Sequence, residues 1–207
     1  MLTCYLDLKS HYSIKQAYGS PEVLVDRAKE LGCTSVALTD YNSISGCINF
    51  AEACKKKGLK SILGCTFSIK ESGRITVLAK NLDGWKSLIK LVSLSYTSEF
   101  FDSINEKPYL TLNKLKEFGT NLVFIIGVPG DLIHNGIFQK SVQHLNRDGV
   151  ITEIVTDPLV MLNGIYEHLE GFSVYVGLSP NNTDYTNWFN EVVRDSGLPA
   201  VILSNAH

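Results

Sequence analysis

Short apolar runs alternate with amphipathic helical patterns along the chain, and this alternation restricts the fold more than any other feature. Ser20-Pro21-Glu22 predicts a helix start, because serine caps a first turn, proline fits its first position and an acid favours its positive end. Gly32 is the matching helix stop. Repeated strand-then-helix units predict a parallel sheet with helices outside it, either a barrel or a doubly wound sheet.

The predicted elements follow this pattern and include one hairpin. Apolar or β-rich runs predict strands near 2–8, 34–38, 60–69, 74–79, 121–127, 172–177 and 199–203. Helical patterns predict helices near 20–31, 43–57, 85–96, 111–119, 132–145, 158–169 and 183–196. Between two of the strands, Glu71-Ser72-Gly73 predicts a tight turn.

Composition narrows the class of protein. With 44% hydrophobic and 19% charged residues the chain can bury a core. Nineteen Lys plus Arg against 21 Asp plus Glu argue against a domain that holds DNA by bulk electrostatics.

The five cysteines are an odd number without a C-x-x-C pair, which is typical of reduced thiols in the cytoplasm. No apolar run approaches the roughly 20 residues that span a bilayer.

The end of the chain leads to an expectation about its organisation. The sequence stops at His207, directly after a predicted strand and without a closing helix. We therefore expect residues 1–207 to form a single domain without an internal boundary, and to be the N-terminal fragment of a longer polypeptide.

Functional residues of a βα barrel lie just past the C-terminal ends of its strands. The polar side chains at those positions are Asp7, Lys9, Ser10, His11, Thr39, Asp40, Tyr41, Thr66, Asn205 and His207. Asp7, Lys9 and His11 alternate, so they share one face if the strand stays extended. Polar residues that converge in this way would suit a metal or phosphate site.

Several long segments carry a resemblance to a known family. In order and spacing they resemble the N-terminal PHP domain (polymerase and histidinol phosphatase domain) of the bacterial DNA polymerase III alpha subunit. The segments are SHYSI, SPEVLVDRAKELG, SVALTDYNSISGCINFAEACKKKGLKSILGC, VLAKNLDGWKSLIKLVSLSY, NLVFIIGVPG and GLPAVILSNAH. The resemblance implies an α/β fold, a distorted seven-stranded βα barrel of the TIM-like kind. Active members hold two or three metal ions and hydrolyse phosphoesters, in some polymerases as a proofreading 3′–5′ exonuclease.

This sequence departs from the family's metal-ligand pattern. The residual ligand positions that the resemblance implies are His11, Asp40 and His207. Other residues stand where the family has a ligand, and they are Lys9, Tyr41, Thr66, Arg74, Asn205 and, in a loosely aligned segment, Ser179.

These replacements change the electrostatics of the predicted site. A divalent ion usually takes four or more ligands, and positive side chains at Lys9 and Arg74 would repel it. We therefore expect Lys9 and Arg74 to pair with Asp40 or Asp7, in the place of the lost metals. Buried acids can be kept in this way without coordination.

The resemblance predicts a non-catalytic PHP domain of a DNA-directed DNA polymerase, a nucleotidyltransferase of DNA replication. It implies support of the polymerase palm and thumb, docking of a proofreading exonuclease and other replisome proteins, and DNA contact through the parent chain. No cofactor is expected in the domain, whereas the parent polymerase would use Mg²⁺. One alternative is a metal-dependent phosphoesterase or 3′–5′ exonuclease that uses Zn²⁺ or Mn²⁺ with a reduced ligand set. A second alternative is a free-standing interaction module.

Overall fold

The computed structural model describes residues 4–70, 73–103, 107–127, 142–145, 151–154, 158–178, 191, 193–194 and 197–203. The strands are β1 (Cys4–Leu8), β2 (Ser35–Leu38), β3 (Lys60–Ile69), β4 (Gly73–Ala79), β5 (Phe101–Asp102), β6 (Lys107–Pro108), β7 (Leu122–Ile126), β8 (Val142–Leu145), β9 (Ile151–Ile154), β10 (Ser173–Leu178) and β11 (Ala200–Ile202). The helices are α1 (Pro21–Glu30), α2 (Cys47–Lys57), α3 (Leu82–Ser95), α4 (Leu112–Glu117) and α6 (Pro158–His168).

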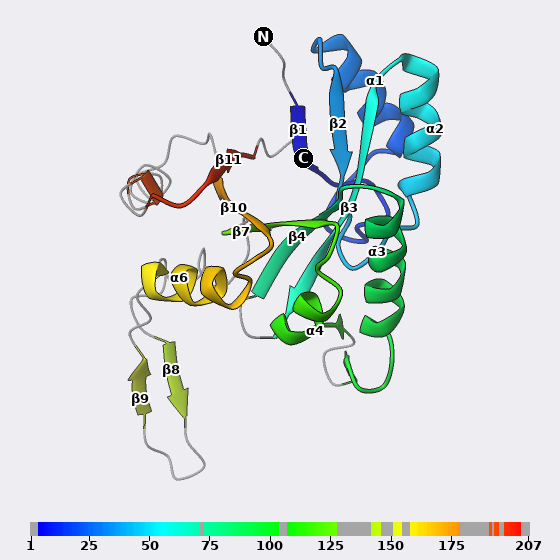
Figure 1. Ribbon diagram of the computed structural model, residues 1–207. Coiled ribbons are helices and arrows are strands. Elements are labelled where there is room, and N and C mark those ends of the chain that lie inside the picture. The colour runs from blue at the N-terminus through cyan, green and yellow to red at the C-terminus, as the bar shows by residue number, and fades with distance from the viewer. Residues whose placement is uncertain are drawn as a thin grey trace.

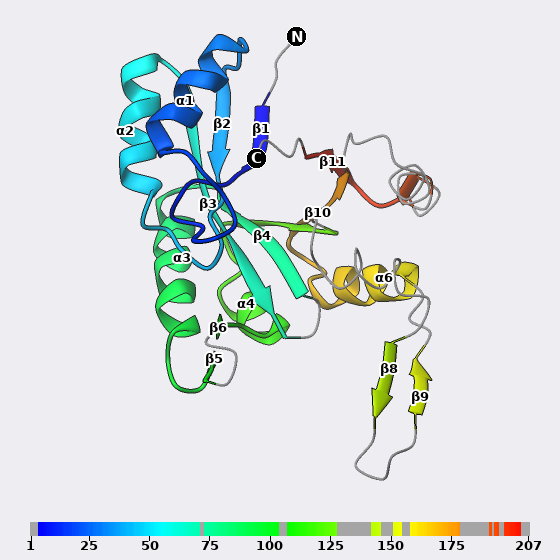
Figure 2. The ribbon, with the colours of Figure 1, turned by 180° about the vertical axis from the view of Figure 1, so that it is seen from behind.

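Seven strands form one curled sheet in the order β1-β2-β3-β4-β7-β10-β11. All neighbouring pairs are parallel except those of β4, which runs antiparallel to both β3 and β7. The sheet bends into a half-barrel with the helices outside it (Figures 1 and 2). The predicted α/β barrel fold with one hairpin is therefore confirmed.

The helices pack on the convex face of this sheet. Val25 of α1 and Phe50 of α2 are fully buried against the first strands. Leu88, Leu115 and Leu162, from α3, α4 and α6, are equally buried against the strands β3, β4, β7 and β10. Each such side chain stabilises the fold by roughly 1.5–3 kcal/mol relative to exposure, so the convex face holds most of the core.

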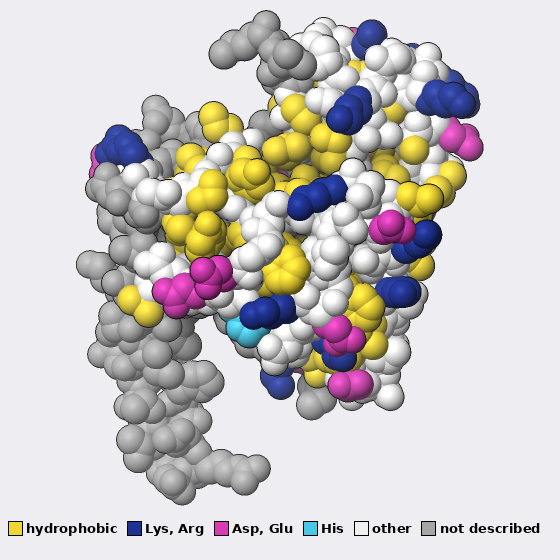
Figure 3. All heavy atoms as spheres, in the orientation of Figure 1, with side chains coloured by type: hydrophobic (Ala, Val, Ile, Leu, Met, Phe, Trp, Pro, Cys, Tyr) yellow, Lys and Arg dark blue, Asp and Glu magenta, His cyan; other side chains and the backbone are white. Residues whose placement is uncertain are grey.

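The concave face changes character along the strands. Ala37, Leu78 and Ile125 form an apolar cluster on it, and Figure 3 shows hydrophobic side chains gathered over the middle of the sheet. Thr39 lies two residues beyond Ala37, and Thr76 two residues before Leu78 in the antiparallel strand, so both threonines share that face. The concave face thus becomes polar toward the C-terminal ends of the parallel strands.

The predicted helix boundaries are largely confirmed. The Ser20 hydroxyl accepts a hydrogen bond from the Val23 amide at 3.4 Å, and Gly32 has φ +76° at the end of α1. Gly58 ends α2 with φ +70°. That helix begins later than predicted, because the Cys47 amide closes a turn on the Ile44 carbonyl at 3.0 Å.

The helix predicted over 132–145 is wrong where the structure describes it. Residues Val142–Leu145 form strand β8, paired antiparallel with β9. Three of the four residues of β9 are β-branched, and such residues favour extended backbone. This neighbouring strand, which lies outside the predicted helix, offers β8 a pairing partner and explains the difference. Residues 132–141 and most of the predicted helix 183–196 lie outside the described residues.

No described helix is both long and apolar enough to cross a membrane.

The buried cysteines give a first testable prediction. Burial raises the pKa of Cys47 to about 12 and that of Cys54 to about 11, and it also raises the pKa of Cys33 and Cys65. These four thiols therefore stay protonated and shielded at pH 8, whereas Cys4 is only half-buried. We expect Ellman's reagent to label at most Cys4 rapidly in the native chain and all five thiols after unfolding. Rapid native labelling of two or more thiols would contradict this burial.

Candidate functional site

The polar end of the concave face is built around Lys9, which directly follows β1. Its side chain is 3% exposed, and its ammonium group forms an ion pair with the Asp7 carboxylate. The same ammonium donates to the hydroxyls of Thr39 and Thr66, each at 2.8 Å. A lysine ammonium has three N–H groups, so these partners satisfy all of its donors.

The hydroxyls around Lys9 are also bonded to one another and to Asp7. The Thr39 hydroxyl donates to Asp7 Oδ1 at 3.0 Å, and the Thr76 hydroxyl donates to the same oxygen at 3.4 Å. The hydroxyls of Thr66 and Thr76 are 2.7 Å apart. The three threonines are at most 1% exposed, so this buried charge pair lies in a closed hydrogen-bond network. We call Asp7, Lys9, Thr39, Thr66 and Thr76 the lysine cluster.

The charge of Lys9 depends on its partner. Burial lowers the pKa of Lys9 below its ordinary value, and the Asp7 carboxylate acts in the opposite direction. Desolvation always favours the neutral amine, while a carboxylate in contact favours the ammonium. The protonation of Lys9 therefore depends on the presence of the Asp7 carboxylate.

Asp40 lies beside the lysine cluster but has different partners. It is 1% exposed, and it accepts hydrogen bonds from the Ser10 amide at 2.6 Å, the Ser10 hydroxyl at 2.8 Å and the Ser13 hydroxyl at 2.6 Å. Gly46 makes room for it, since a Cβ there would lie 2.8 Å from the Tyr12 ring and 3.2 Å from Asp40 Oδ2. Asp40 thus fixes the loop that follows β1.

Arg74 contacts an aromatic ring instead of a carboxylate. Its guanidinium carbon lies 4.2 Å from the centre of the Tyr41 ring, and Lys9 Nζ lies 4.9 Å from the same centre. The Nη2 atom of Arg74 also donates a hydrogen bond to Gln16 Oε1 at 2.9 Å. The prediction of two ion pairs is therefore confirmed for Lys9 with Asp7 and wrong for Arg74. A tyrosine ring offers a cation its negative face, which gives Arg74 a partner without an acid.

The structure places His11 on the surface, whereas the predicted ligand Asp40 is buried. Strand β1 ends at Leu8, and His11 lies exposed in the following turn, where its amide donates to the Gly19 carbonyl at 2.9 Å. Its ring stacks obliquely on Tyr12 with 4.5 Å between centres. The predicted shared face therefore holds for Asp7 and Lys9 only, because the chain turns after Lys9. Residues 179, 205 and 207 lie outside the described residues.

Sequence reasoning missed two members of this region. Ser13 holds Asp40 and also accepts a hydrogen bond from the Tyr41 amide at 3.1 Å, and Thr76 closes the ring of threonine hydroxyls. Ser13 carries no motif that would mark it. Thr76 could have been found from its antiparallel register with Thr66, since directly opposed residues on one face come into contact.

The described residues do not fit the metal ions that the resemblance implies. They contain no group of three or more His, Cys, Asp and Glu side chains arranged to hold a metal ion. The ammonium of Lys9 also lies directly on the Asp7 carboxylate, where its positive charge repels a cation. The chemistry available in the lysine cluster is hydrogen bonding and charge pairing.

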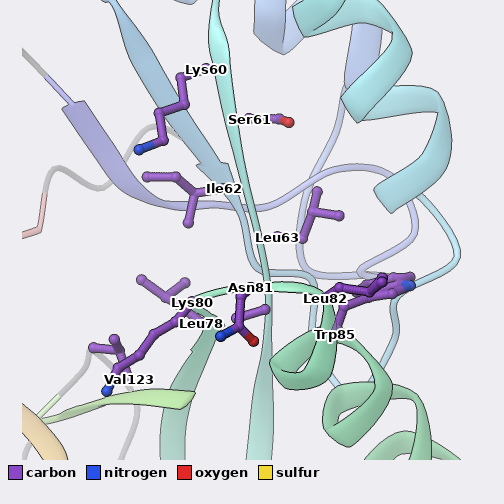
Figure 4. Close-up of a pocket in the computed structure, with 11 residues that line it drawn as sticks. Lys60, Ser61, Ile62, Leu63, Leu78, Lys80, Asn81, Leu82, Trp85 and Val123 are labelled. Atoms are coloured by element: carbon purple, nitrogen blue, oxygen red, sulfur yellow. The ribbon is translucent and has the colours of Figure 1, made fainter. Parts of the chain in front are cut away.

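A second hollow lies at the opposite end of β3 and β4 (Figure 4). Its volume is about 630 Å³, and apolar side chains such as Ile62, Leu63 and Trp85 line much of it. Lys80 at its edge donates to the Ser173 hydroxyl at 2.7 Å, and Asn81 caps α3. Two of its polar side chains, Lys80 and Asn81, are thus engaged in the fold.

The chain matches known proteins in sequence. The family model of the PHP domain matches residues 6–154. DNA polymerase III subunit alpha of Buchnera aphidicola subsp. Schizaphis graminum is 34% identical over 131 residues, which are 59% of this chain and 11% of that protein. The error-prone DNA polymerase of Corynebacterium efficiens is 31% identical over 153 residues, or 72% of this chain and 13% of that protein. The chain thus spans about an eighth of the length of these relatives.

Solved structures of similar fold have low sequence identity. An amidohydrolase from Chromobacterium violaceum has a TM-score of 0.59 at 14% identity, covering 99% of this chain and 87% of its own. A two-domain protein from Bacteroides vulgatus that contains a predicted PHP-like metal-dependent phosphoesterase has a TM-score of 0.59 at 14% identity. That match covers 100% of this chain and 52% of the other. Such likeness shows the fold.

The pairing of Lys9 with Asp7 predicts a non-additive effect on stability. Lys9→Met leaves a buried carboxylate without its cation, so we expect the free energy of unfolding to fall by about 3–5 kcal/mol. The double variant Asp7→Asn/Lys9→Met removes both charges and should recover most of that loss. Urea denaturation of the two variants and of the wild type measures both effects.

Lys90→Met is the matched control, because Lys90 is exposed on α3 and its loss should change stability by less than about 0.5 kcal/mol. A loss of stability in Lys9→Met no larger than that of this control would contradict the stabilising role of the ion pair.

Proposed function

Because this chain belongs to the PHP domain family, we propose that it is a non-catalytic structural domain of a replicative-type DNA polymerase chain. In this proposal the Lys9–Asp7 pair takes the place that metal ions have in active members. The domain spans residues 1–207 and supports the polymerase palm and thumb.

One observation carries the non-catalytic part of the proposal. The ammonium of Lys9 is buried among Asp7, Thr39 and Thr66 at the strand ends where a barrel enzyme has its active site. A metal ion there would require the removal of a buried cation that has all of its hydrogen bonds. The ion-pair and hydroxyl network therefore favours a structural role for these strand ends.

The relatives support the polymerase part. They are named DNA polymerase III subunit alpha and error-prone DNA polymerase, and each is several times longer than this chain. Within the proposal, DNA synthesis with Mg²⁺ belongs to the parent chain in the cytoplasm. A proofreading exonuclease and other replisome proteins are its partners, and DNA is contacted through the parent chain.

Metal content tests the proposal against a metal-dependent phosphoesterase. After dialysis against Zn²⁺ and Mn²⁺ and removal of free metal, we expect elemental analysis to find less than about a tenth of an ion per chain, because Lys9 repels cations. We expect no hydrolysis of p-nitrophenyl phosphate above the rate in buffer with either metal.

The matched control restores ligands at three described positions, in the variant Lys9→His/Tyr41→His/Thr66→Glu. This variant should hold more metal than the wild type, since it replaces a cation and two weak ligands by two imidazoles and a carboxylate. One or more tightly held ions in the wild type, with metal-dependent hydrolysis, would overturn the proposal.

A further inference from the structure

A cavity of about 710 Å³ adjoins the lysine cluster on its solvent side, and its charged lining is entirely basic among the described residues. Lys15, Arg74 and Lys107 contribute the charges. The lining also includes Tyr41, which contacts both Arg74 and Lys9. This concentration of positive charge contrasts with the net charge of −2 of the whole chain.

Two of these cations lack an acidic partner in the part of the chain that the structure describes. The ion pairs recorded there involve Lys9, Arg27, Lys57, Lys86 and Lys114. Lys15 and Arg74 are not among them, and Arg74 is held by an amide oxygen and an aromatic ring. Lys107 lies opposite Asp102 in the short β5–β6 ladder. Among the described residues, no carboxylate is thus recorded in an ion pair with Lys15 or Arg74.

Unusual backbone conformations occur at the same cavity. Lys15 has φ +63° and Asn42 has φ +49°, and both residues line the cavity. Asn42 is fixed there by two hydrogen bonds to Ser68, at 2.9 and 3.0 Å. A lysine in the left-handed region costs energy and persists only where the surroundings enforce it, and such residues cluster at functional sites.

We propose that this cavity binds a phosphate group, carried by a nucleotide or by the end of a nucleic acid, through Lys15 and Arg74 and without a metal ion. The inference rests on the proposed function, because a metal-free site needs protein cations to neutralise the phosphate. Guanidinium and ammonium groups together supply charge-assisted hydrogen bonds to several phosphate oxygens. The volume lies in the range of cavities that hold small ligands.

Phosphate fits this lining better than a carboxylate of an acidic peptide. The donors come from separate elements, Lys15 from the loop after β1 and Arg74 from the start of β4. A tetrahedral dianion can accept from several directions at once, whereas a carboxylate is planar and singly charged. The hollow shape also suits a compact group more than an extended peptide.

Binding can be measured by NMR titration of the ¹⁵N-labelled 207-residue chain in EDTA. The probes are inorganic phosphate, deoxyadenosine monophosphate, a 5′-phosphorylated oligonucleotide and, as the ligand without phosphate, deoxyadenosine. We expect saturable shifts at Lys15 and Arg74 with the three phosphate compounds, a Kd for the nucleotide of about 1 mM or tighter, and no shift with deoxyadenosine. The relative affinities of the nucleotide and the oligonucleotide identify the source of the phosphate.

Variants test the named residues. Arg74→Gln should weaken binding about tenfold and Lys15→Gln about threefold, since each removes one charge-assisted contact. Lys15 is exposed, so its replacement leaves the fold intact even if Arg74→Gln disturbs the packing on Tyr41. Lys90→Gln, on the outer helix α3, should leave the affinity unchanged.

The possible outcomes separate this inference from the proposed function. Binding in EDTA that weakens in both variants supports the inference. Absence of binding with and without added metal overturns the inference and leaves the non-catalytic proposal standing. Binding that appears only when Mn²⁺ is added overturns both. Tighter binding of a poly-glutamate peptide than of the nucleotide overturns the inference in favour of an acidic protein partner.

Discussion

The ion pair between Lys9 and Asp7 is the interaction on which the polar end of this barrel depends. A buried charge is costly unless it is paired and hydrogen-bonded. Here the ammonium uses its three donors on Asp7, Thr39 and Thr66, and these partners come from three neighbouring strands or strand ends. The pair therefore does more than neutralise one acid, because it links β1, β2 and β3 at the C-terminal ends of these parallel strands.

The curled sheet explains why the cluster forms at this place. Parallel strands end at the same edge, and the reversal of β4 brings Thr76 and Arg74, near its start, to that edge as well. Helices cover the convex face with apolar side chains, so polar residues are left for the concave face and its rim. Positive charge then accumulates at the rim, in the order Lys9, Arg74 and Lys15 from the interior outward.

Much of the fold could be predicted from sequence because its signals are local. Capping by Ser20 and termination at Gly32 and Gly58 depend on neighbouring residues only. The exposure of His11 could not be predicted in this way, since it depends on where β1 ends. The stacking of Arg74 on Tyr41 was also missed, because the register of β3 and β4 and the path of the loop after β2 decide it. Residues 142–145 were predicted as helix, because their strand pairing with residues 151–154 depends on a segment outside the predicted helix.

We propose that the ammonium of Lys9 occupies the place of a metal ion. Anomalous X-ray diffraction from crystals of the chain grown with MnCl₂ tests this claim most directly, because manganese scatters anomalously and a lysine nitrogen does not. We expect no anomalous peak beside Asp7 or Asp40, and we expect electron density of Lys9 that is continuous toward Asp7. A manganese peak bound to these carboxylates, with the Lys9 side chain turned to solvent, would contradict it.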